Sequence, residues 1–434
     1  MDLDFNEEQQ MLRETVQRLC AECAPINVVR EMEDDPIGYP EKLWKQMAEL
    51  GLTGLTLPEE YGGSGQSFVE AAIMYEELGR ALAPSPHFVS AVLGAGVLLE
   101  AGSDAQKRAW LPKIASGEAI LTPAWLEPQN GYGPRGVQVK AVLEGDKYRV
   151  SGTKRHVLFA AAATRLLVLV RTGDGEQDID LLLVDPKAPG VQLTQQYSLA
   201  SDTQYKVVFT DVLVPAAGRI GAAKSGWATW NKVMHDGIIL LGAWAIGGAQ
   251  RALEMMVQYS KEREQFDKPL GAFQALAHYM SDASAAVDGG TTLAYEAAWA
   301  CANGKSIERL APMAKLFACQ TFRDVTATAQ QIYGGMGFTL ECDIQLFFRR
   351  AKQLQLSWWD GRYLEELIAR TVLDHGAPVR LTDDGRKTFK WPPEPIPVGV
   401  RSKQQLALAL AEHANQRGRA QAFRDQVKQQ VKKK

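Results

Sequence analysis

Apolar residues recur at helical spacing through the first 120 residues of the chain. Leu12, Val16 and Leu19 form one such series, and residues 43–50 contain a second. Because side chains three or four positions apart share one face of a helix, each series predicts an amphipathic helix with a buried face. Gly51 ends the second helix, and turn residues dominate the loop that follows it. Further helical segments are expected at 68–82 and 105–115.

The hydrophobic pattern changes between residues 121 and 225. Short runs rich in Val, Leu and Tyr alternate with Gly, Asp and Pro, which is typical of short strands separated by turns. We expect a turn at Ser151-Gly152. Several strands at this spacing indicate a small β-sandwich or barrel. The expected strands are 138–144, 148–150, 166–171, 179–184, 191–195 and 205–210.

Long helical segments return after residue 226, and short connections between them imply an antiparallel four-helix bundle. Leu310, Ala314, Phe317 and Thr321 mark a buried stripe on the third segment. The expected helices are 227–263, 272–302, 308–333 and 361–374.

The remainder of the chain, 376–434, has a different composition. Trp391–Pro397 is rich in proline and predicts an extended linker. Residues 401–434 then hold nine Lys and Arg against two acidic residues, in a pattern that looks helical. The sequence therefore predicts an α+β protein. Its expected parts are an N-terminal helical domain (1–120), a middle β domain (121–225), a C-terminal four-helix bundle (226–375) and a C-terminal extension (376–434).

Composition narrows the class of protein. A chain of 434 residues with a net charge of -3 forms about two to four structural units and demands no polyanionic partner. Five sparsely placed cysteines favour a reduced, cytoplasmic protein, and no cysteine or histidine cluster suggests a metal site. The acidic N-terminus argues against a targeting peptide. No apolar run reaches the ~18 residues of a membrane span, so we expect no membrane partner.

Two segments at helix ends carry candidate chemistry: Tyr259–Gln274, and Gln331–Phe338 with its glycine pair. Their order and spacing resemble two segments of the acyl-CoA dehydrogenase family. Leu50–Gly65 and Leu111–Glu118 also look like that family. The resemblance covers roughly residues 1–375, and it implies the same succession of a helical, a β and a helical domain.

The resemblance also implies an activity. Family members use FAD to remove two hydrogens from the α and β carbons of an acyl-CoA thioester. A carboxylate takes the α proton, and the β hydrogen leaves as a hydride to flavin N5. This chemistry requires a base, donors for the enolate-like oxygen and a flavin stacked on the acyl group. The implied partners are an acyl-CoA substrate, an electron-transferring flavoprotein and further copies of the chain in a homo-dimer or homo-tetramer.

The candidate for the base is Asp360, which precedes Gly361 as the family's Glu precedes a glycine. This match requires about two extra residues, because an ungapped match places Trp358 at the base position. Flanking tryptophans would desolvate the Asp360 carboxylate and raise its pKa toward a useful value. The alternative is that Asp360 only caps the helix that begins near Tyr363.

A second location for the base in the family, on the first bundle helix, corresponds to Gly237 here. A glycine has no side chain that could act as the base. The neighbouring His235 and Asp236 remain as weaker candidates.

For FAD, Arg263 and Phe266 match family positions that contact the pyrophosphate and adenine of a neighbouring subunit's cofactor. A guanidinium suits a phosphate in both geometry and charge. Gln331, Gly334 and Gly335 match the complementary surface, where the absence of side chains lets phosphate approach the backbone. The alternative for Arg263 is a surface ion pair with a nearby Glu.

On the flavin-ring side, the resemblance places Trp125 and Leu126 in one segment and His156 and Val157 in another. Leu126 replaces a family threonine, and Tyr132-Gly133 replace a Ser-Asp pair. His156 could stack on the flavin, or it could be an ordinary histidine at a strand end.

The leading interpretation is an FAD-dependent acyl-CoA dehydrogenase. The lost hydroxyls motivate a second one, a subunit of low activity that a related chain completes in a heterotetramer. A third is a fold relative that is a flavin monooxygenase or binds nucleic acid, since the basic tail could contact phosphates. A solvated or subunit-wrapping helix is the favoured interpretation of that tail.

Overall fold

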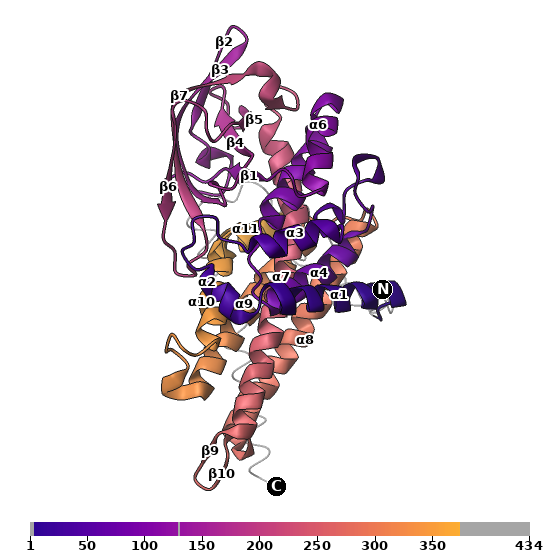
Figure 1. Cartoon of the computed structure of the whole chain (residues 1–434), viewed down its shortest axis with the longest axis vertical. Helices are drawn as coiled ribbons and strands as arrows, with labels where there is room; N and C mark the ends of the chain where they lie inside the picture. Colours follow the sequence, from indigo (N-terminus) through magenta and orange to yellow (C-terminus); the bar gives the residue numbers. More distant parts are fainter. Residues whose placement is uncertain (1–3, 129–130, 374–434) are drawn as a thin grey trace, which may run out of the picture. The chain divides into compact units, whose positions relative to one another are not determined.

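Figure 1 shows the computed structural model, which describes residues 4–128 and 131–373. The predicted linker and basic tail, 376–434, lie outside the described residues. The chain divides into two units, 1–368 and 369–434, and every contact given below lies within the first. In the part of the chain that is described, no helix has the length and apolar character that crossing a membrane requires.

The N-terminal domain consists of helices, three of which begin with a capping box. In each box a side chain at the helix start and one three residues later hold each other's backbone N–H, which fixes where the helix begins. The α-helices are α1 (Glu7–Cys23), α2 (Ile26–Glu31), α3 (Glu41–Glu49), α4 (Phe68–Arg80), α5 (Ala95–Ala101) and α6 (Asp104–Ala115). A π-helical segment, η3 (Phe88–Gly94), precedes α5.

The middle domain is one eight-stranded sheet in the order β6-β7-β3-β2-β4-β5-β8, with β1 paired to β4. Residues from both halves of the sheet share one apolar core, as in a barrel or sandwich. The strands are β1 (Leu121–Ala124), β2 (Lys140–Glu144), β3 (Lys147–Leu158), β4 (Arg165–Arg171), β5 (Ile179–Val184), β6 (Val191–Gln196), β7 (Gln204–Pro215) and β8 (Arg219–Ile220).

The turn predicted at Ser151-Gly152 is wrong. The residues lie inside β3, where the register against β7 shifts between Val150 and Gly152. Gly152 has a φ of +143°, a backbone conformation that side chains with a Cβ rarely adopt. The glycine therefore marks a β-bulge that bends the strand without ending it.

Strand β4 connects the two cores of the molecule. Leu166, Val168 and Val170 face the core inside the β domain, whereas Leu167 and Leu169 join the core made with the helices. A strand that is buried on both faces reads as a continuous apolar run, which explains the sequence pattern here.

The C-terminal domain is a helical bundle built on the long helix α7 (Gly226–Glu262), which packs on α4, α8 (Gln274–Ala302) and α9 (Leu310–Tyr333). The backbones approach closely where α4 crosses α7, because a Cβ on Gly247 would lie 1.8 Å from the Glu76 carbonyl oxygen. A hairpin of β9 (Glu264–Gln265) and β10 (Lys268–Pro269) follows α7.

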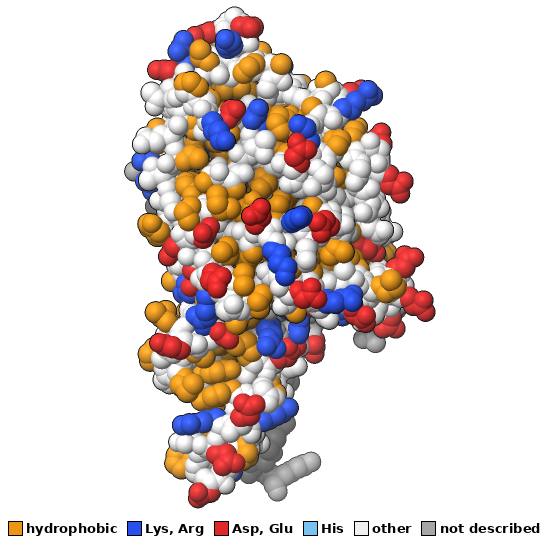
Figure 2. All heavy atoms as spheres, in the orientation of Figure 1, with side chains coloured by type: hydrophobic (Ala, Val, Ile, Leu, Met, Phe, Trp, Pro, Cys, Tyr) orange, Lys and Arg blue, Asp and Glu red, His pale blue; other side chains and the backbone are white. Residues whose placement is uncertain are grey.

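Two further helices follow α9: α10 (Ile344–Leu356), which the sequence pattern did not predict, and α11 (Gly361–Leu373). The predicted stripe on α9 holds for Ala314 and Thr321, which are buried, but Phe317 is 40% exposed. Large apolar side chains are also exposed after α9, at Met336 and Phe338. Figure 2 shows apolar side chains spread over this face of the molecule, including a patch above the end where Figure 1 places the β9–β10 hairpin.

Candidate active site

Aromatic rings from four parts of the chain pack together between the β domain and the bundle. Trp125, just after β1, stacks on Trp358 with ring centroids 6.2 Å apart and an interplanar angle of 10°. The ring centroids of Trp230 (on α7) and Tyr132 lie 5.4 and 5.9 Å from that of Trp125. Phe88 meets Trp358 edge-on at 5.1 Å. This aromatic cluster joins the predicted flavin segment to the predicted base segment.

A buried lysine holds the turn that carries Trp358. The Lys315 ammonium, from near the start of α9, donates to the carbonyls of Ser357 and Trp359, each at 2.9 Å. It also reaches Leu354 at 3.4 Å, so it satisfies carbonyls that the end of α10 leaves open. Burial lowers the pKa of Lys315 below its ordinary value.

Trp358 and Trp359 both have positive φ angles, 54° and 72°, which are strained for residues with a large side chain. The surrounding contacts impose this conformation: Trp359 is fully buried, and its ring lies 4.9 Å from that of His235. The indole Nε1 atoms of Trp359 and Trp230 are buried without a hydrogen-bond partner in the described part of the chain.

The predicted base, Asp360, follows this turn directly. Its Oδ1 accepts a hydrogen bond of 2.9 Å from the Tyr363 backbone N–H at the start of α11. The carboxylate thus makes the capping contact that the alternative interpretation expects. Trp358, and not Asp360, is among the residues that line the neighbouring cavity. The role of Asp360 as a base stays a prediction.

The weaker base candidates lie on α7. Burial raises the pKa of Asp236 to about 6, and the Cys301 thiol lies 3.8 Å from its carboxylate. Burial also lowers the pKa of His235. Asp236 lines a different cavity, near Lys232, from the one that Trp358 lines. A Cβ on Gly237 would lie 3.0 Å from the Leu93 side chain, so this position has little room for a larger residue.

The two predicted flavin-ring segments lie side by side. Lys154 of β3 forms a fully buried ion pair with Glu127 at 2.7 Å and donates to the Trp125 carbonyl at 3.2 Å. The Arg155 backbone N–H donates to the Leu126 carbonyl at 2.9 Å. Burial lowers the pKa of Lys154 to about 8, although Glu127 opposes the shift. The ion pair therefore fixes the strand that carries His156 against residues 125–127.

The residues predicted to line the flavin ring differ in how far their side chains are exposed. His156 is exposed, and its Nδ1 lies 2.7 Å from the Gln204 side-chain oxygen. Val157 is buried in the core of the β domain, so only its backbone faces outward. Leu126 is half-buried and packs against the main core.

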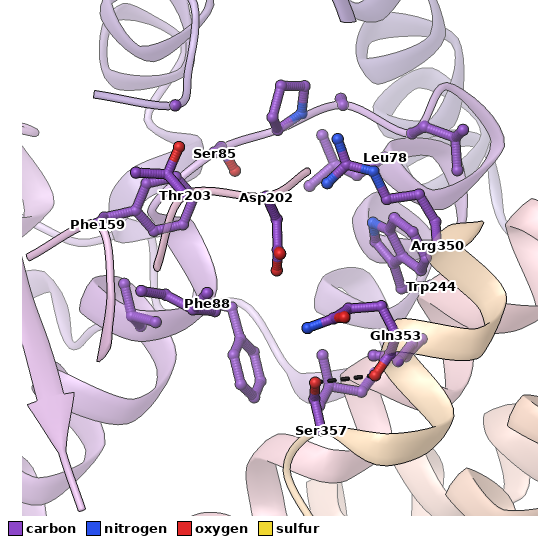
Figure 3. Close-up of a pocket in the computed structure, with 18 of the residues that line it drawn as sticks. Leu78, Ser85, Phe88, Phe159, Asp202, Thr203, Trp244, Arg350, Gln353 and Ser357 are labelled. Carbon is purple, nitrogen blue, oxygen red and sulfur yellow. Dashed lines mark hydrogen bonds between the residues drawn. The ribbon is translucent and has the colours of Figure 1, made fainter. Parts of the chain in front are cut away.

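An apolar cavity lies beside the aromatic cluster, between α4, η3, α7 and α10 (Figure 3). Its walls include Leu78, Phe88 and Trp244. Arg350, Gln353 and Asp202 add polar groups, which the sequence analysis missed. Burial lowers the pKa of Arg350, while Asp202 and Glu33 oppose this shift. The helical spacing of positions 350, 353, 354 and 357 was a signal that could have identified this face of α10.

The second group of predicted residues lies at the other end of α7. Tyr259 of α7 and Tyr333 of α9 stack with centroids 4.1 Å apart, which brings the two helix ends together. Arg263, Phe266, Gln331, Gly334 and Gly335 are all exposed there. Phe266 is 85% exposed, with a φ of 56°.

This end fits one part of an FAD molecule. Arg263 has no ion-pair partner among the described residues, so the predicted alternative of a pair with a nearby Glu is wrong. A Cβ on Gly334 or Gly335 would meet nothing within 4 Å, so the backbone is open to a ligand. A guanidinium without an ion pair, at a helix end where glycines leave the backbone uncovered, suits a pyrophosphate.

The two groups lie too far apart to share one cofactor within a single chain. Trp230 and Arg263 are separated by the length of α7, roughly 50 Å at 1.5 Å per residue. An FAD that uses both groups must therefore contact two chains.

Comparisons with known proteins identify the family. Three family models match: acyl-CoA dehydrogenase N-terminal domain (6–118), middle domain (123–212) and C-terminal domain (224–372). The probable acyl-CoA dehydrogenase YngJ of Bacillus subtilis is 33% identical over 86% of this chain and 100% of its own length.

Two further relatives are complex subunits by their names. The caffeyl-CoA reductase-Etf complex subunit CarC of Acetobacterium woodii is 28% identical over 80% of this chain and 93% of its own length. In the ChsE4-ChsE5 complex from Mycobacterium tuberculosis, one chain superposes with a TM-score of 0.78 at 27% identity. It covers 86% of this chain and 99% of that chain.

Proposed function

This chain belongs to the FAD-dependent acyl-CoA dehydrogenase family, and we propose that it converts an acyl-CoA thioester to the 2-enoyl-CoA. The observation that carries this proposal is the cavity: an apolar space that reaches Trp358, on which the flavin segment residue Trp125 stacks. An acyl chain in the cavity would bring its thioester end to the 358–360 turn, beside residues 125–127.

In this proposal each residue group has a separate task. Arg263, Phe266, Gln331, Gly334 and Gly335 of one chain hold the pyrophosphate and adenine side of FAD. Trp125, Leu126, His156 and the Val157 backbone of another chain line the flavin ring, and the aromatic packing around Trp125 excludes water. FAD, when bound, supplies the acceptor for the hydride. Asp360 exchanges its contact with the Tyr363 N–H for the α proton of the substrate.

The proposed partners follow from the family and from the relatives. We infer that an electron-transferring flavoprotein takes the electrons, because a relative is named as a subunit of an Etf complex. The shared cofactor requires at least a dimer, and a homo-tetramer would pair two such dimers. The cysteine usage favours a cytoplasmic location.

Anaerobic titration tests the proposal. The protein, supplemented with FAD, is titrated with a panel of acyl-CoAs while the visible flavin absorbance is followed, for wild type and Asp360→Asn. Asparagine keeps a side-chain oxygen for the helix cap but is no base at neutral pH. The expected result is bleaching by some thioester in the wild type and its loss in the variant. FAD that binds and never bleaches contradicts the proposal.

A second candidate has its own support. Trp358 lines the cavity where an ungapped match expects the base, Leu158 lines the same cavity, and Leu126 stands where the family has a threonine. These features favour a chain that contributes half of an FAD site to a related, active chain. In that case the isolated protein binds no FAD, and mixing it with the related chain restores FAD binding and bleaching.

A further inference from the structure

We propose that the cavity beside the aromatic cluster selects acyl groups whose far end carries an oxygen that accepts hydrogen bonds, and that Arg350 donates to this oxygen. The proposal deepens the proposed function and rests on it, since it names the class of acyl group that the same cavity takes. The carbonyl of a ketone and a carboxylate both supply such an oxygen.

One face of α10 supplies the polar side of the cavity. Arg350, Gln353 and Ser357 line it together with Leu354 and Trp358, and their spacing of three and four places them on one face of the helix. Figure 3 shows the Gln353 amide and the Asp202 carboxylate pointing into the cavity, with Arg350 on its rim. A ligand lying along this face meets the reactive end at Trp358 and the guanidinium at the other end.

Arg350 differs from the preceding residue, Arg349, in the partners that the protein gives its guanidinium. Arg349 forms an ion pair with Glu33 and donates to Gln345 at 2.7 Å and to the Leu199 carbonyl at 3.2 Å. Arg350 has no hydrogen bond or ion pair among the described residues, and its Nε is buried. Leaving a buried charged donor unsatisfied costs free energy, on the order of 1–3 kcal/mol. A ligand oxygen would offset this cost.

The chemistry of the guanidinium determines what it can bind. It carries five N–H donors and no acceptor, so its ligand must supply the acceptor. A plain alkyl chain would cover the guanidinium and leave these donors without a partner. The Gln353 amide, which has no hydrogen bond from its side chain in the described structure, provides a further donor to the same space.

The Asp202 carboxylate bears on which oxygen-bearing group the cavity takes. Its Oδ1 accepts hydrogen bonds from Ser198 and, at 2.7 Å, from Gln204, so the protein holds this carboxylate in place. A second anion beside Asp202 would be repelled. We therefore expect a neutral ketone to bind at least as tightly as a carboxylate.

The position of the oxygen along the acyl group follows from the helix. Arg350 precedes Trp358 by eight positions, most of them in α10, which corresponds to about 12 Å at 1.5 Å per residue. The acyl group is therefore expected to carry its oxygen on the order of 12 Å from the thioester, well beyond the carbons that react.

Equilibrium binding of matched acyl-CoAs tests the inference. Three thioesters of equal length, ending in a methyl group, a ketone or a carboxylate, are titrated by calorimetry into FAD-supplemented protein. The variants are Arg350→Met and Gln353→Leu. Lys352→Met is the control, because it removes a charge from the same helix outside the cavity.

Arg350→Met is expected to weaken binding of the oxygenated thioesters roughly 10-fold to 100-fold, as loss of a charge-assisted hydrogen bond does. The alkyl thioester should lose little affinity, and Lys352→Met should change none of the three. Gln353→Leu should produce a smaller loss with the same selectivity.

If the alkyl and oxygenated thioesters bind alike, or if Arg350→Met weakens all of them equally, the inference is overturned while the proposed function stands. If no acyl-CoA binds to the wild type at all, the proposed function fails, and this inference fails with it.

Discussion

The two ends of α7 differ in how far this chain satisfies its own polar groups. At the N-terminal end, Lys154 and Glu127 pair with each other in the interior, and Lys315 satisfies the carbonyls after α10. At the C-terminal end, Arg263 has no ion pair in the described structure, and Phe266 lies 85% exposed. In the first region these buried charges have partners within the chain, whereas the second region offers exposed groups without partners.

The difference separates stability from recognition. Substitutions of the paired charges in the first region should act mainly on folding, because each of these charges is buried with a fixed protein partner. Substitutions of exposed side chains in the second region should act mainly on ligand binding, because these side chains contribute little to the folded state. Four predictions, ordered from the largest expected effect to the smallest, separate effects on stability from effects on ligand binding.

Lys154→Met should destabilise the protein most, by about 3–5 kcal/mol, because it leaves the buried Glu127 carboxylate without its cation. The measurement is the free energy of unfolding in urea. Arg149→Met is the matched control: it breaks the exposed pair with Glu144 in the same domain and should change little. Equal losses in the two variants would contradict a special role for the buried pair.

His87 should make stability depend on pH. It is buried, Tyr75 donates to its Nδ1 at 2.8 Å, and burial lowers its pKa from 6.5 to about 4. Between these values the unfolded chain binds the proton and the native state does not, so stability is complete above pH 6.5 and falls toward pH 4.

This loss amounts to roughly 3 kcal/mol across the window. His87→Gln lacks the titrating group, so its stability relative to wild type should improve as the pH falls from 7 to 4. Urea unfolding at several pH values measures the difference. A constant difference between the two proteins would exclude His87 as the source.

Arg263→Met should leave stability unchanged and weaken FAD binding roughly 10-fold to 100-fold, because it removes a charge-assisted contact to phosphate. Flavin fluorescence during titration of the apoprotein measures the affinity. Lys261→Met removes another exposed cation two positions earlier and should have little effect. A similar loss in both variants would indicate a general charge effect.

Gly334 and Gly335 both have room for a side chain, but only Gly334 has a positive φ, so substitutions at the two positions isolate the cost of the backbone conformation. Gly334 has φ 62° and ψ -138°, a conformation that costs other residues about 1–3 kcal/mol. Gly334→Ala should therefore lower the unfolding free energy by this amount. Gly335→Ala, where no positive φ occurs and the space is equally open, should be nearly neutral. If both substitutions were neutral, the strain argument would fail.

The sequence predicted the fold best where a segment shows a clear apolar pattern of one kind, either that of a strand or that of a helix. The expected strand at 179–184 coincides with β5, and the expected helix at 272–302 nearly coincides with α8. Strand β1 was missed because Pro123 lies within it, and proline argues against a strand. Helix α10 was missed, although its buried residues Ile344, Phe347, Ala351 and Leu354 recur at helical spacing and form one stripe.

The site was less predictable, since it depends on partners distant in sequence. The segments at 125–127 and 154–157 were recognisable, but the buried Lys154–Glu127 pair that joins them was not. Nothing in the sequence indicates that two consecutive tryptophans adopt positive φ, because the contacts of Lys315 and His235 impose it. Spacing could have placed Arg350 on one face of a helix, but its lack of partners is visible only in the structure.

The length of α7 has a consequence for how the protein behaves on dilution. If one FAD needs the opposite ends of this helix from two chains, each cofactor site exists only in the assembled state. Cofactor occupancy then depends on protein concentration as well as on FAD concentration, as for any ligand that binds only the associated form. Activity per chain should fall as the protein is diluted, and excess FAD should partly restore it by drawing chains back together.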